Sequence, residues 1–142
     1  MSSGQIRLFD NTRNPFDDLQ KALDYAKVSQ KNILIEVGGD WCSWCHTLEK
    51  FITSHRELYE MRSLYFVYFK VFIDEHDDTN AEFLQRMPPV EGVPHYFVYD
   101  PRGKFLHSQP TDPLEEGDSY SYDRIFAFFT EWGFKTNPNE RL

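Results

Sequence analysis

Two cysteines separated by two residues are the side chains whose type and spacing most clearly suggest chemistry. Cys42 and Cys45 are the cysteines of this chain, and they lie in the stretch Trp-Cys-Ser-Trp-Cys-His, residues 41–46. Residues 33–37 predict a buried strand before the pair, and the residues after it predict a helix. At such a junction backbone N–H groups and the helix dipole favour an anion, which lowers the pKa of the first thiol. We therefore expect thiol–disulfide exchange, with Cys42 attacking and Cys45 closing the ring.

A carboxyl group lies within the strand predicted before the cysteines. Glu36 is six residues ahead of Cys42 and is flanked by apolar residues. Burial in apolar surroundings raises the pKa of a carboxyl group, because it disfavours the charged form. A carboxyl group with a raised pKa suits proton transfer near neutral pH. We therefore expect Glu36 to accept and return the proton of the inner thiol, Cys45.

Length and composition predict one domain over residues 1–142 and exclude several kinds of partner. A chain of this size buries roughly two thirds of its unfolded surface, so it needs no metal or disulfide staple to fold. The net charge of −8 argues against nucleic acid or an anionic membrane as a partner. No stretch approaches the roughly 20 apolar residues that span a bilayer. We expect a monomer without cofactor or metal.

The first residues, Met-Ser-Ser-Gly, lack the basic and hydrophobic segments of a secretory signal. The chain as written therefore predicts a cytoplasmic protein. If a leader has been removed, we expect a periplasmic or secreted protein instead. A single CxxC pair fits both a reducing and an oxidising compartment.

The rest of the chain alternates predicted strands and helices. Strands are expected over residues 6–9, 33–37, 64–73, 96–99 and 104–107. Helices are expected to begin at Pro15, after Cys42, at capping boxes that start with Ser54 and Thr79, and near Ile125. Alternating βαβ units predict a parallel core, to which the closing hairpin adds antiparallel strands. The polar residues 108–120 predict a surface loop, and residues 136–142 a flexible tail.

Four of these features, in this order, resemble the thioredoxin superfamily over roughly residues 16–132. They are the strand at 33–37, the W-C-x-x-C helix start, the strand ending at Asp74, and Gly-Val-Pro at 92–94 before the hairpin. The resemblance implies the thioredoxin fold, an α/β architecture whose central mixed sheet of four to five strands has helices on both faces. Its core would be about 14–133, with 108–120 as an insertion.

The resemblance also implies an activity and partners. The motif W-C-x-W-C-H is similar to a thioredoxin-like subgroup of thiol–disulfide interchange or isomerase-like proteins. The chain would then be a protein-disulfide reductase or isomerase. Its partners would be protein disulfides as substrates and an oxidoreductase that supplies electrons.

Further site residues follow from the same resemblance. A cis proline lies beside the disulfide in this family, so the bond between Val93 and Pro94 is expected to be cis. The backbone at Val93 would then pair with an extended substrate. Lys70 matches the family's lysine partner of the buried acid, here Glu36, where the family usually has aspartate.

The residues around the motif complete the expected site. Trp41 and Trp44 flank a thiol expected to be exposed, so we expect them to form an apolar rim for peptide substrates. His46, when protonated, would tune the pKa of the neighbouring thiol; the alternative is a solvated helix residue. His95 follows the proline and is expected to line the site.

Three alternatives to disulfide exchange fit parts of the pattern. The sequence C-x-x-C-H also occurs where c-type haem is attached, with His46 as axial ligand. Cys42, Cys45 and two histidines would make a zinc site, although no histidine pair has finger-like spacing. A thioredoxin-fold module that binds peptides without redox activity is the third, and the presence of both cysteines weighs against it.

Overall fold

Four strands form the central sheet of the computed structural model, which describes residues 7–133, and the two inner strands carry most of the buried apolar residues of the sheet. In spatial order they are β2 (Phe66–Phe72), β1 (Asn32–Gly38), β3 (His95–Tyr99) and β4 (Phe105–Pro110). β1 and β2 run parallel, and β3 is antiparallel to both β1 and β4. The expected mixed sheet is confirmed. Residues 7–9 form no strand, so the first expected strand is wrong there, and Ile6 lies outside the described residues.

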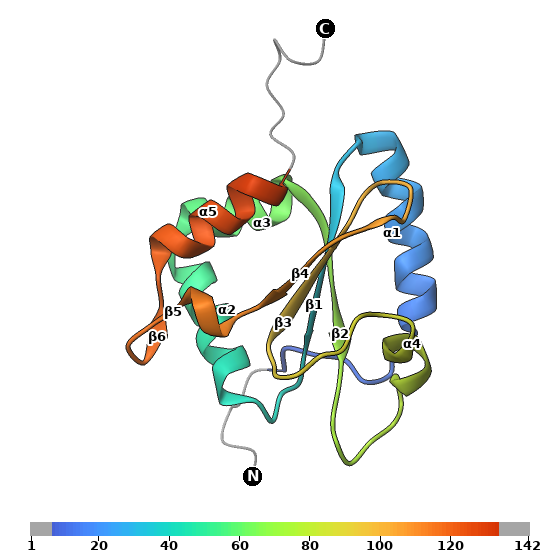
Figure 1. Cartoon of the computed structure of the whole chain (residues 1–142), viewed down its shortest axis with the longest axis horizontal. Coiled ribbons are helices and arrows are strands. Elements are labelled where there is room, and N and C mark those ends of the chain that lie inside the picture. Colours follow the sequence, from blue (N-terminus) through green and yellow to red (C-terminus); the bar gives the residue numbers. More distant parts are fainter. Residues whose placement is uncertain (1–6, 134–142) are drawn as a thin grey trace, which may run out of the picture.

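Helices cover both faces of this sheet, as the sequence predicts (Figure 1). α1 (Pro15–Ser29) and the short α4 (Ala81–Gln85) pack on one face. α2 (Ser43–Ser54), α3 (Arg56–Leu64) and α5 (Tyr122–Trp132) pack on the other. Asn14 caps α1 by accepting the N–H of Phe16 at 2.9 Å, and Pro15 occupies the first helical position. The described residues contain no helix that is long and apolar enough to cross a membrane.

The alternation of side chains along β1 decides which residues can face the cysteines. Ile33, Ile35 and Val37 point toward α1, whereas Leu34 packs with the residues of α2, α3 and α5. Glu36 shares the face of Leu34, because successive side chains on a strand point to opposite faces. The sheet therefore presents a carboxyl group to the underside of α2.

Both expected capping boxes are wrong. α3 is preceded by His55, and the Ser54 hydroxyl instead donates back to the carbonyl of Lys50 at 2.5 Å. α4 is preceded by Asn80, whose side-chain amide donates to the carbonyl of Phe72 at 2.9 Å. Both helices nevertheless begin within two residues of the expected positions.

Residues 108–120 are more ordered than the surface loop that their composition predicts. β4 continues to Pro110, a 3₁₀ turn covers Asp112–Leu114, and a small hairpin pairs β5 (Glu115–Glu116) with β6 (Ser119–Tyr120). Leu114 and Tyr120 are only 5% and 3% exposed. These two apolar side chains anchor an otherwise polar segment against the core. The predicted tail, 136–142, lies outside the described residues.

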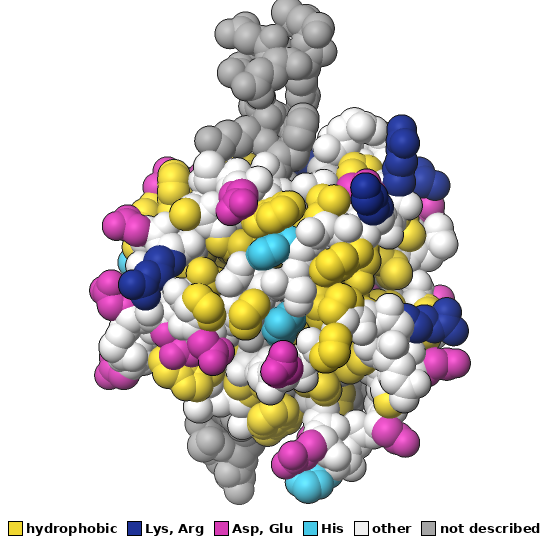
Figure 2. Space-filling view, in the orientation of Figure 1, with side chains coloured by type: hydrophobic (Ala, Val, Ile, Leu, Met, Phe, Trp, Pro, Cys, Tyr) yellow, Lys and Arg dark blue, Asp and Glu magenta, His cyan; other side chains and the backbone are white. Residues whose placement is uncertain are grey.

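The surface shows how charge is distributed around the sheet. On the face shown in Figure 2, hydrophobic side chains gather over the middle of the molecule, where β3 and β4 lie in Figure 1. Charged side chains lie toward its periphery, and the lower end of this face shows acidic side chains and no lysine or arginine among the described residues. This lower end includes the loop between β2 and α4.

Candidate active site

Cys42 occupies the N-cap position of α2, where its sulfur takes the place of the usual cap oxygen. Its backbone is extended, with φ −95° and ψ 113°, and its Sγ accepts the backbone N–H of Cys45 at 3.1 Å. The backbone N–H of Trp44 also lowers the pKa of this thiol. Backbone donors at a helix N-terminus stabilise an anion. The local fold therefore favours the thiolate form of Cys42.

The two thiols have opposite pKa shifts. The hydrogen bond from the Cys45 side chain lowers the pKa of Cys42 to about 7, helped by the two backbone N–H groups and by the charge of His46, while burial opposes it. The hydrogen bond to Cys42 raises the pKa of Cys45, and burial adds to that rise. At neutral pH the outer sulfur is thus available as a nucleophile while the inner sulfur keeps its proton.

Burial of the pair differs from the expectation of an exposed thiol. Cys42 is 6% exposed and Cys45 is fully buried, and both thiols are free. The Cys42 thiol lies 3.6 Å from the carbonyl oxygen of Val93, and the bond between Val93 and Pro94 is cis, as expected. The nearly buried sulfur of Cys42 therefore lies directly beside the backbone of Val93.

Glu36 is fully buried on the face of the sheet beneath α2. The hydroxyl of Tyr68 donates to Glu36 Oε1 at 2.8 Å, whereas Oε2 has no hydrogen-bond partner among the described residues. Burial raises the pKa of Glu36, although the positive charges of Lys70 and Arg62 oppose the rise. The charge of Glu36 in turn raises the pKa of Cys45. The two groups are therefore close enough to interact electrostatically, as a proton donor and acceptor must be.

Lys70 does not pair with Glu36, contrary to the expectation. Its Nζ lies 3.2 Å from Oε1 of Glu49, which is on α2. The guanidinium of Arg62 also binds Glu49, donating to its two oxygens at 2.9 and 3.2 Å, and lies 4.6 Å from the centre of the Tyr68 ring. Glu36 and Lys70 are register partners on adjacent strands, but the ion pair of Lys70 is with Glu49.

The two tryptophans have different surroundings. Trp41 is 55% exposed, and its indole N–H donates to the carbonyl of Ile73 at 2.8 Å, which fixes the ring beside the motif. Trp44 is half buried and packs edge-on against Tyr120, with ring centres 5.4 Å apart. Only Trp41 of the two is therefore mainly solvent-exposed, whereas Trp44 packs both on the hairpin of β5 and β6 and on the cluster that contains the two cysteines.

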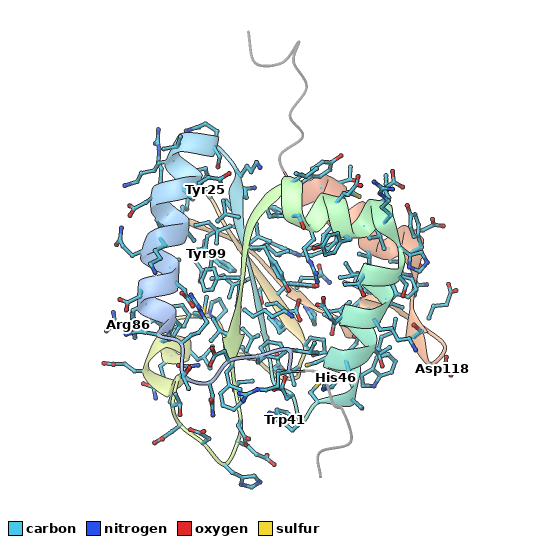
Figure 3. The ribbon with its side chains drawn as sticks, turned by 180° about the vertical axis from the view of Figure 1, so that it is seen from behind. Tyr25, Trp41, His46, Arg86, Tyr99 and Asp118 are labelled. Carbon is cyan, nitrogen blue, oxygen red and sulfur yellow. The ribbon has the colours of Figure 1, made fainter. Side chains whose placement is uncertain are left out.

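The two histidines, His46 and His95, also have different surroundings. His46 lies on α2, with Nε2 2.7 Å from the carbonyl oxygen of Asp40, close to Trp41 at the same end of the molecule (Figure 3). His95 is 5% exposed, and its Nε2 lies 2.7 Å from the hydroxyl of Ser108. Its ring packs against Phe97 on the sheet face opposite Glu36. His95 therefore lies on the other face of the sheet from Glu36, and its expected place at the site stays a prediction.

Sequence reasoning missed an aromatic residue that covers the thiols. Phe9 is 3% exposed and packs against Cys42 and Cys45. The carboxylate of Asp40 accepts the N–H groups of Leu8 and Phe9 at 2.6 and 3.0 Å, which holds this segment in place. A Cβ at Gly38 would lie 2.7 Å from both Cys45 Sγ and the Phe9 ring, so only glycine fits there. In the sequence, the Gly-Gly pair at 38–39 is the one feature that indicates how closely Phe9 and Cys45 approach the backbone.

The surroundings of the motif disfavour two of the alternatives. The thiol of Cys45 is fully buried, so a haem vinyl group would have to displace α2 to reach it. Within residues 7–133 no group of three or more histidine, cysteine, aspartate or glutamate side chains is placed to hold a metal ion. The arrangement instead suits a reversible disulfide between two adjacent sulfurs.

Comparisons with known proteins concern the family and the fold. The sequence profile of a family described as thioredoxin-like matches residues 14–101. Comparison with curated protein sequences gave no match. The fold is similar to that of a disulphide isomerase from Xylella fastidiosa Temecula1, with a TM-score of 0.76 and 23% identity over 89% of this chain and 96% of that one.

Two further solved structures share the fold. One is named DsbH oxidoreductase, with a TM-score of 0.58 and 21% identity over 79% of this chain and 81% of that one. The other is the oxidised C-terminal domain of DsbD from Neisseria meningitidis, with a TM-score of 0.57 and 15% identity over 82% and 95% of the two chains. At these identities the likeness describes the fold.

Proposed function

The chain belongs to the thioredoxin-like family, and from that premise we propose that it is a thiol–disulfide oxidoreductase acting on protein disulfides as a reductase or isomerase. The observation that carries the proposal is the contact between two thiols with opposite pKa shifts, Cys42 at about 7 and Cys45 raised. An attacking thiol is most effective when its pKa lies near the ambient pH. A buried neighbour that keeps its proton until it is needed is suited to resolve the product.

The proposed reaction has two exchange steps. The Cys42 thiolate attacks one sulfur of a substrate disulfide, the substrate S–S bond breaks, and one substrate thiolate leaves. Cys45 then transfers its proton to Glu36 and attacks the sulfur of Cys42, which releases the second substrate thiolate and forms the Cys42–Cys45 disulfide. Two electrons pass to the substrate, so an oxidoreductase must supply two electrons to restore the dithiol.

Isomerisation and oxidation use the same residues. In isomerisation the mixed disulfide is attacked by another thiol of the substrate, so that Cys42 is released without net electron transfer. In oxidation the two steps run in reverse. Because disulfides persist mainly outside the cytosol, a periplasmic or secreted location fits these substrates best.

We propose that the substrate approaches along Val93. The carbonyl of Val93 lies 3.6 Å from the Cys42 sulfur, and residues before β3 leave a backbone edge beside the thiol. An extended peptide can pair with such an edge, because main-chain hydrogen bonds do not depend on its sequence. The exposed ring of Trp41, which lines the same pocket as Val93, then offers an apolar contact.

Replacing the resolving thiol tests the proposal. In a Cys45→Ser variant, the mixed disulfide with oxidised insulin should accumulate, because the second step lacks its nucleophile. We expect a covalent adduct that is visible by non-reducing electrophoresis and mass spectrometry, and that is released by dithiothreitol. The matched control is the double variant Cys42→Ser, Cys45→Ser, which should capture nothing. Equal capture by the two variants would contradict the proposed exchange.

A further inference from the structure

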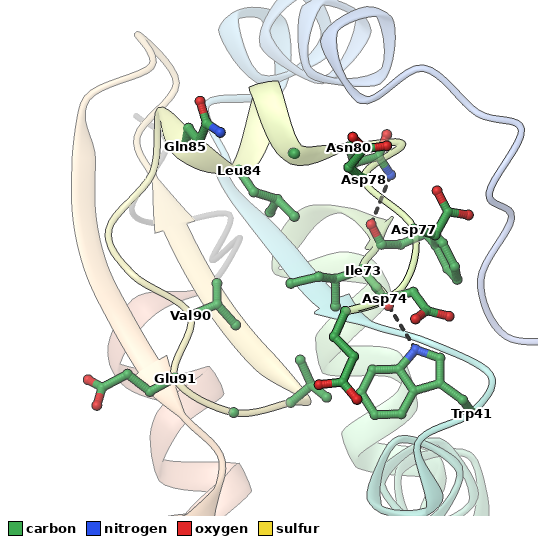
Figure 4. A pocket seen from close by; sticks show the side chains of 15 residues that line it. Trp41, Ile73, Asp74, Asp77, Asp78, Asn80, Leu84, Gln85, Val90 and Glu91 are labelled. Carbon is green, nitrogen blue, oxygen red and sulfur yellow. Dashed lines mark hydrogen bonds between the residues drawn. The ribbon is translucent and has the colours of Figure 1, made fainter.

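A pocket of about 570 Å³ opens beside the attacking sulfur. It lies between Trp41, the end of β2, α4 and the segment that leads to Val93 (Figure 4). Its floor is apolar, and in Figure 4 the side chains of Ile73, Leu84 and Val90 lie toward its middle. An apolar pocket of this size can take one or two side chains of a bound polypeptide.

The rim of this pocket is strongly acidic. Its lining includes five carboxylates and no lysine or arginine; the five are Asp74, Glu75, Asp77, Asp78 and Glu91. Asp74 and Asp77 accept backbone N–H groups that close their own turns, at 2.8 and 2.9 Å. Glu75, Asp78 and Glu91 are exposed. Charges of one sign beside a low-dielectric wall focus the electric field and attract ligands of opposite charge.

Two residues connect this pocket to the reacting sulfur. Trp41 directly precedes Cys42, and Val93 places its carbonyl 3.6 Å from the Cys42 thiol, yet both line the pocket. A substrate cysteine that reaches Cys42 along Val93 therefore places its neighbouring residues over the pocket. An occupant that matches the pocket has an apolar side chain for the floor and a cation for the rim.

We propose that this pocket selects disulfide substrates that carry lysine or arginine together with an apolar side chain close to the attacked cysteine. The proposal rests on the proposed function and names its substrate class: basic polypeptides. The apolar floor contributes affinity, and the acidic rim contributes specificity and association rate, because complementary charge acts mainly on those quantities. An acidic substrate would be repelled by all five carboxylates.

Charge-matched peptides test this selection. Two short disulfide peptides are compared, identical except that two residues beside the cysteine are lysine in one and glutamate in the other. For the wild-type protein we expect kcat/KM to be about tenfold higher for the lysine peptide at low salt. This ratio should fall as ionic strength rises, since exposed charges are screened over about 10 Å at 0.1 M salt.

Two variants that each remove three exposed carboxylates locate the effect. The pocket variant is Glu75→Gln, Asp78→Asn, Glu91→Gln. Its matched control is Glu116→Gln, Asp118→Asn, Glu131→Gln, all exposed and outside the pocket; Figure 3 shows Asp118 on the hairpin, away from Trp41. The peptide ratio should approach one in the pocket variant and stay near the wild-type value in the control. Both variants lose the same net charge.

Each result decides between the proposals. Equal kcat/KM for the two peptides with wild-type protein, or an equal loss of selectivity in both variants, would overturn the selection by charge. Turnover of the uncharged 2-hydroxyethyl disulfide by the wild-type protein reports the thiol chemistry alone. If that turnover is present while the peptide ratio is one, the charge proposal fails and the oxidoreductase proposal stands. If neither peptide nor the small disulfide is turned over, both fail.

Discussion

Replacing Cys42 with serine should abolish the reduction of insulin disulfides, with a loss of at least about 1,000-fold, as expected when a nucleophile is removed. A serine hydroxyl does not ionise near neutral pH, so no anion is available to attack sulfur. Cys45 cannot substitute for it, because it is fully buried and its pKa is raised. The measurement is the turbidity of reduced insulin in the presence of dithiothreitol, compared with the uncatalysed rate.

The fold of this variant is expected to persist. Serine is a favourable N-cap residue, so its oxygen can accept the N–H groups that the sulfur of Cys42 accepts in the wild-type protein. Circular dichroism and the thermal unfolding midpoint should therefore remain close to the wild-type values. Insulin reduction at the wild-type rate by the folded Cys42→Ser protein would show that Cys42 is not the attacking group.

Replacing Glu36 with glutamine should slow turnover about 100-fold at neutral pH, the lower end of what a positioned proton acceptor contributes. Glutamine keeps the volume of the side chain and an oxygen that can accept the Tyr68 hydroxyl, which donates at 2.8 Å in the wild-type protein. It cannot accept the proton of Cys45. The step that slows should therefore be the resolution of the mixed disulfide, and the initial attack by Cys42 should be little affected.

The pH dependence of the Glu36→Gln variant distinguishes the loss of a proton acceptor from a disturbance of the structure. The charge of Glu36 raises the pKa of Cys45, so removing that charge lets Cys45 ionise at a lower pH than in the wild-type protein. The deficit should thus be largest near neutral pH and should shrink as the pH rises, because direct ionisation of Cys45 replaces the missing base. Rapid-mixing measurements of mixed-disulfide lifetime check this, and a deficit that is constant with pH would contradict it.

Local patterns in the sequence were sufficient to predict the strand and the helix that carry the site. The apolar run around Glu36 predicts both a strand and the burial of the carboxyl group. In the structure, residues 33–37 all lie in β1 and are all buried, Glu36 among them. The helix start at Cys42 follows from the position of the motif after that strand. The cis bond before Pro94 came from the resemblance to the thioredoxin superfamily and is present.

Contacts between distant parts of the chain were not accessible from the sequence. The partner of Lys70 depends on where α2 places Glu49, which is 21 residues away. Phe9 packs on the thiols, and its backbone N–H is bound by Asp40, 31 residues later. The alternation along β3 places His95 on the sheet face opposite Glu36, even though it directly follows Pro94. Such pairings depend on tertiary geometry, which composition and periodicity do not encode.

For residues 108–120, amino-acid composition alone is not sufficient to predict the structure. Their proline, glycine and aspartate content favours turns, and turns are indeed present. Two apolar residues, Leu114 and Tyr120, nevertheless decide the outcome, because their burial against the core fixes the whole segment. A count of polar residues hides such isolated anchors.

The most direct test is the rate at which each cysteine of the reduced protein reacts with iodoacetamide as a function of pH, followed by peptide mass spectrometry. The asymmetry of the two thiols predicts that Cys42 is alkylated with an apparent pKa of about 7 and that its rate levels off above that pH. Cys45 should remain unmodified throughout that range. If Cys42 instead reacts with the pKa of a free thiol, about 8.5, or if both cysteines react alike, the account of this site is wrong.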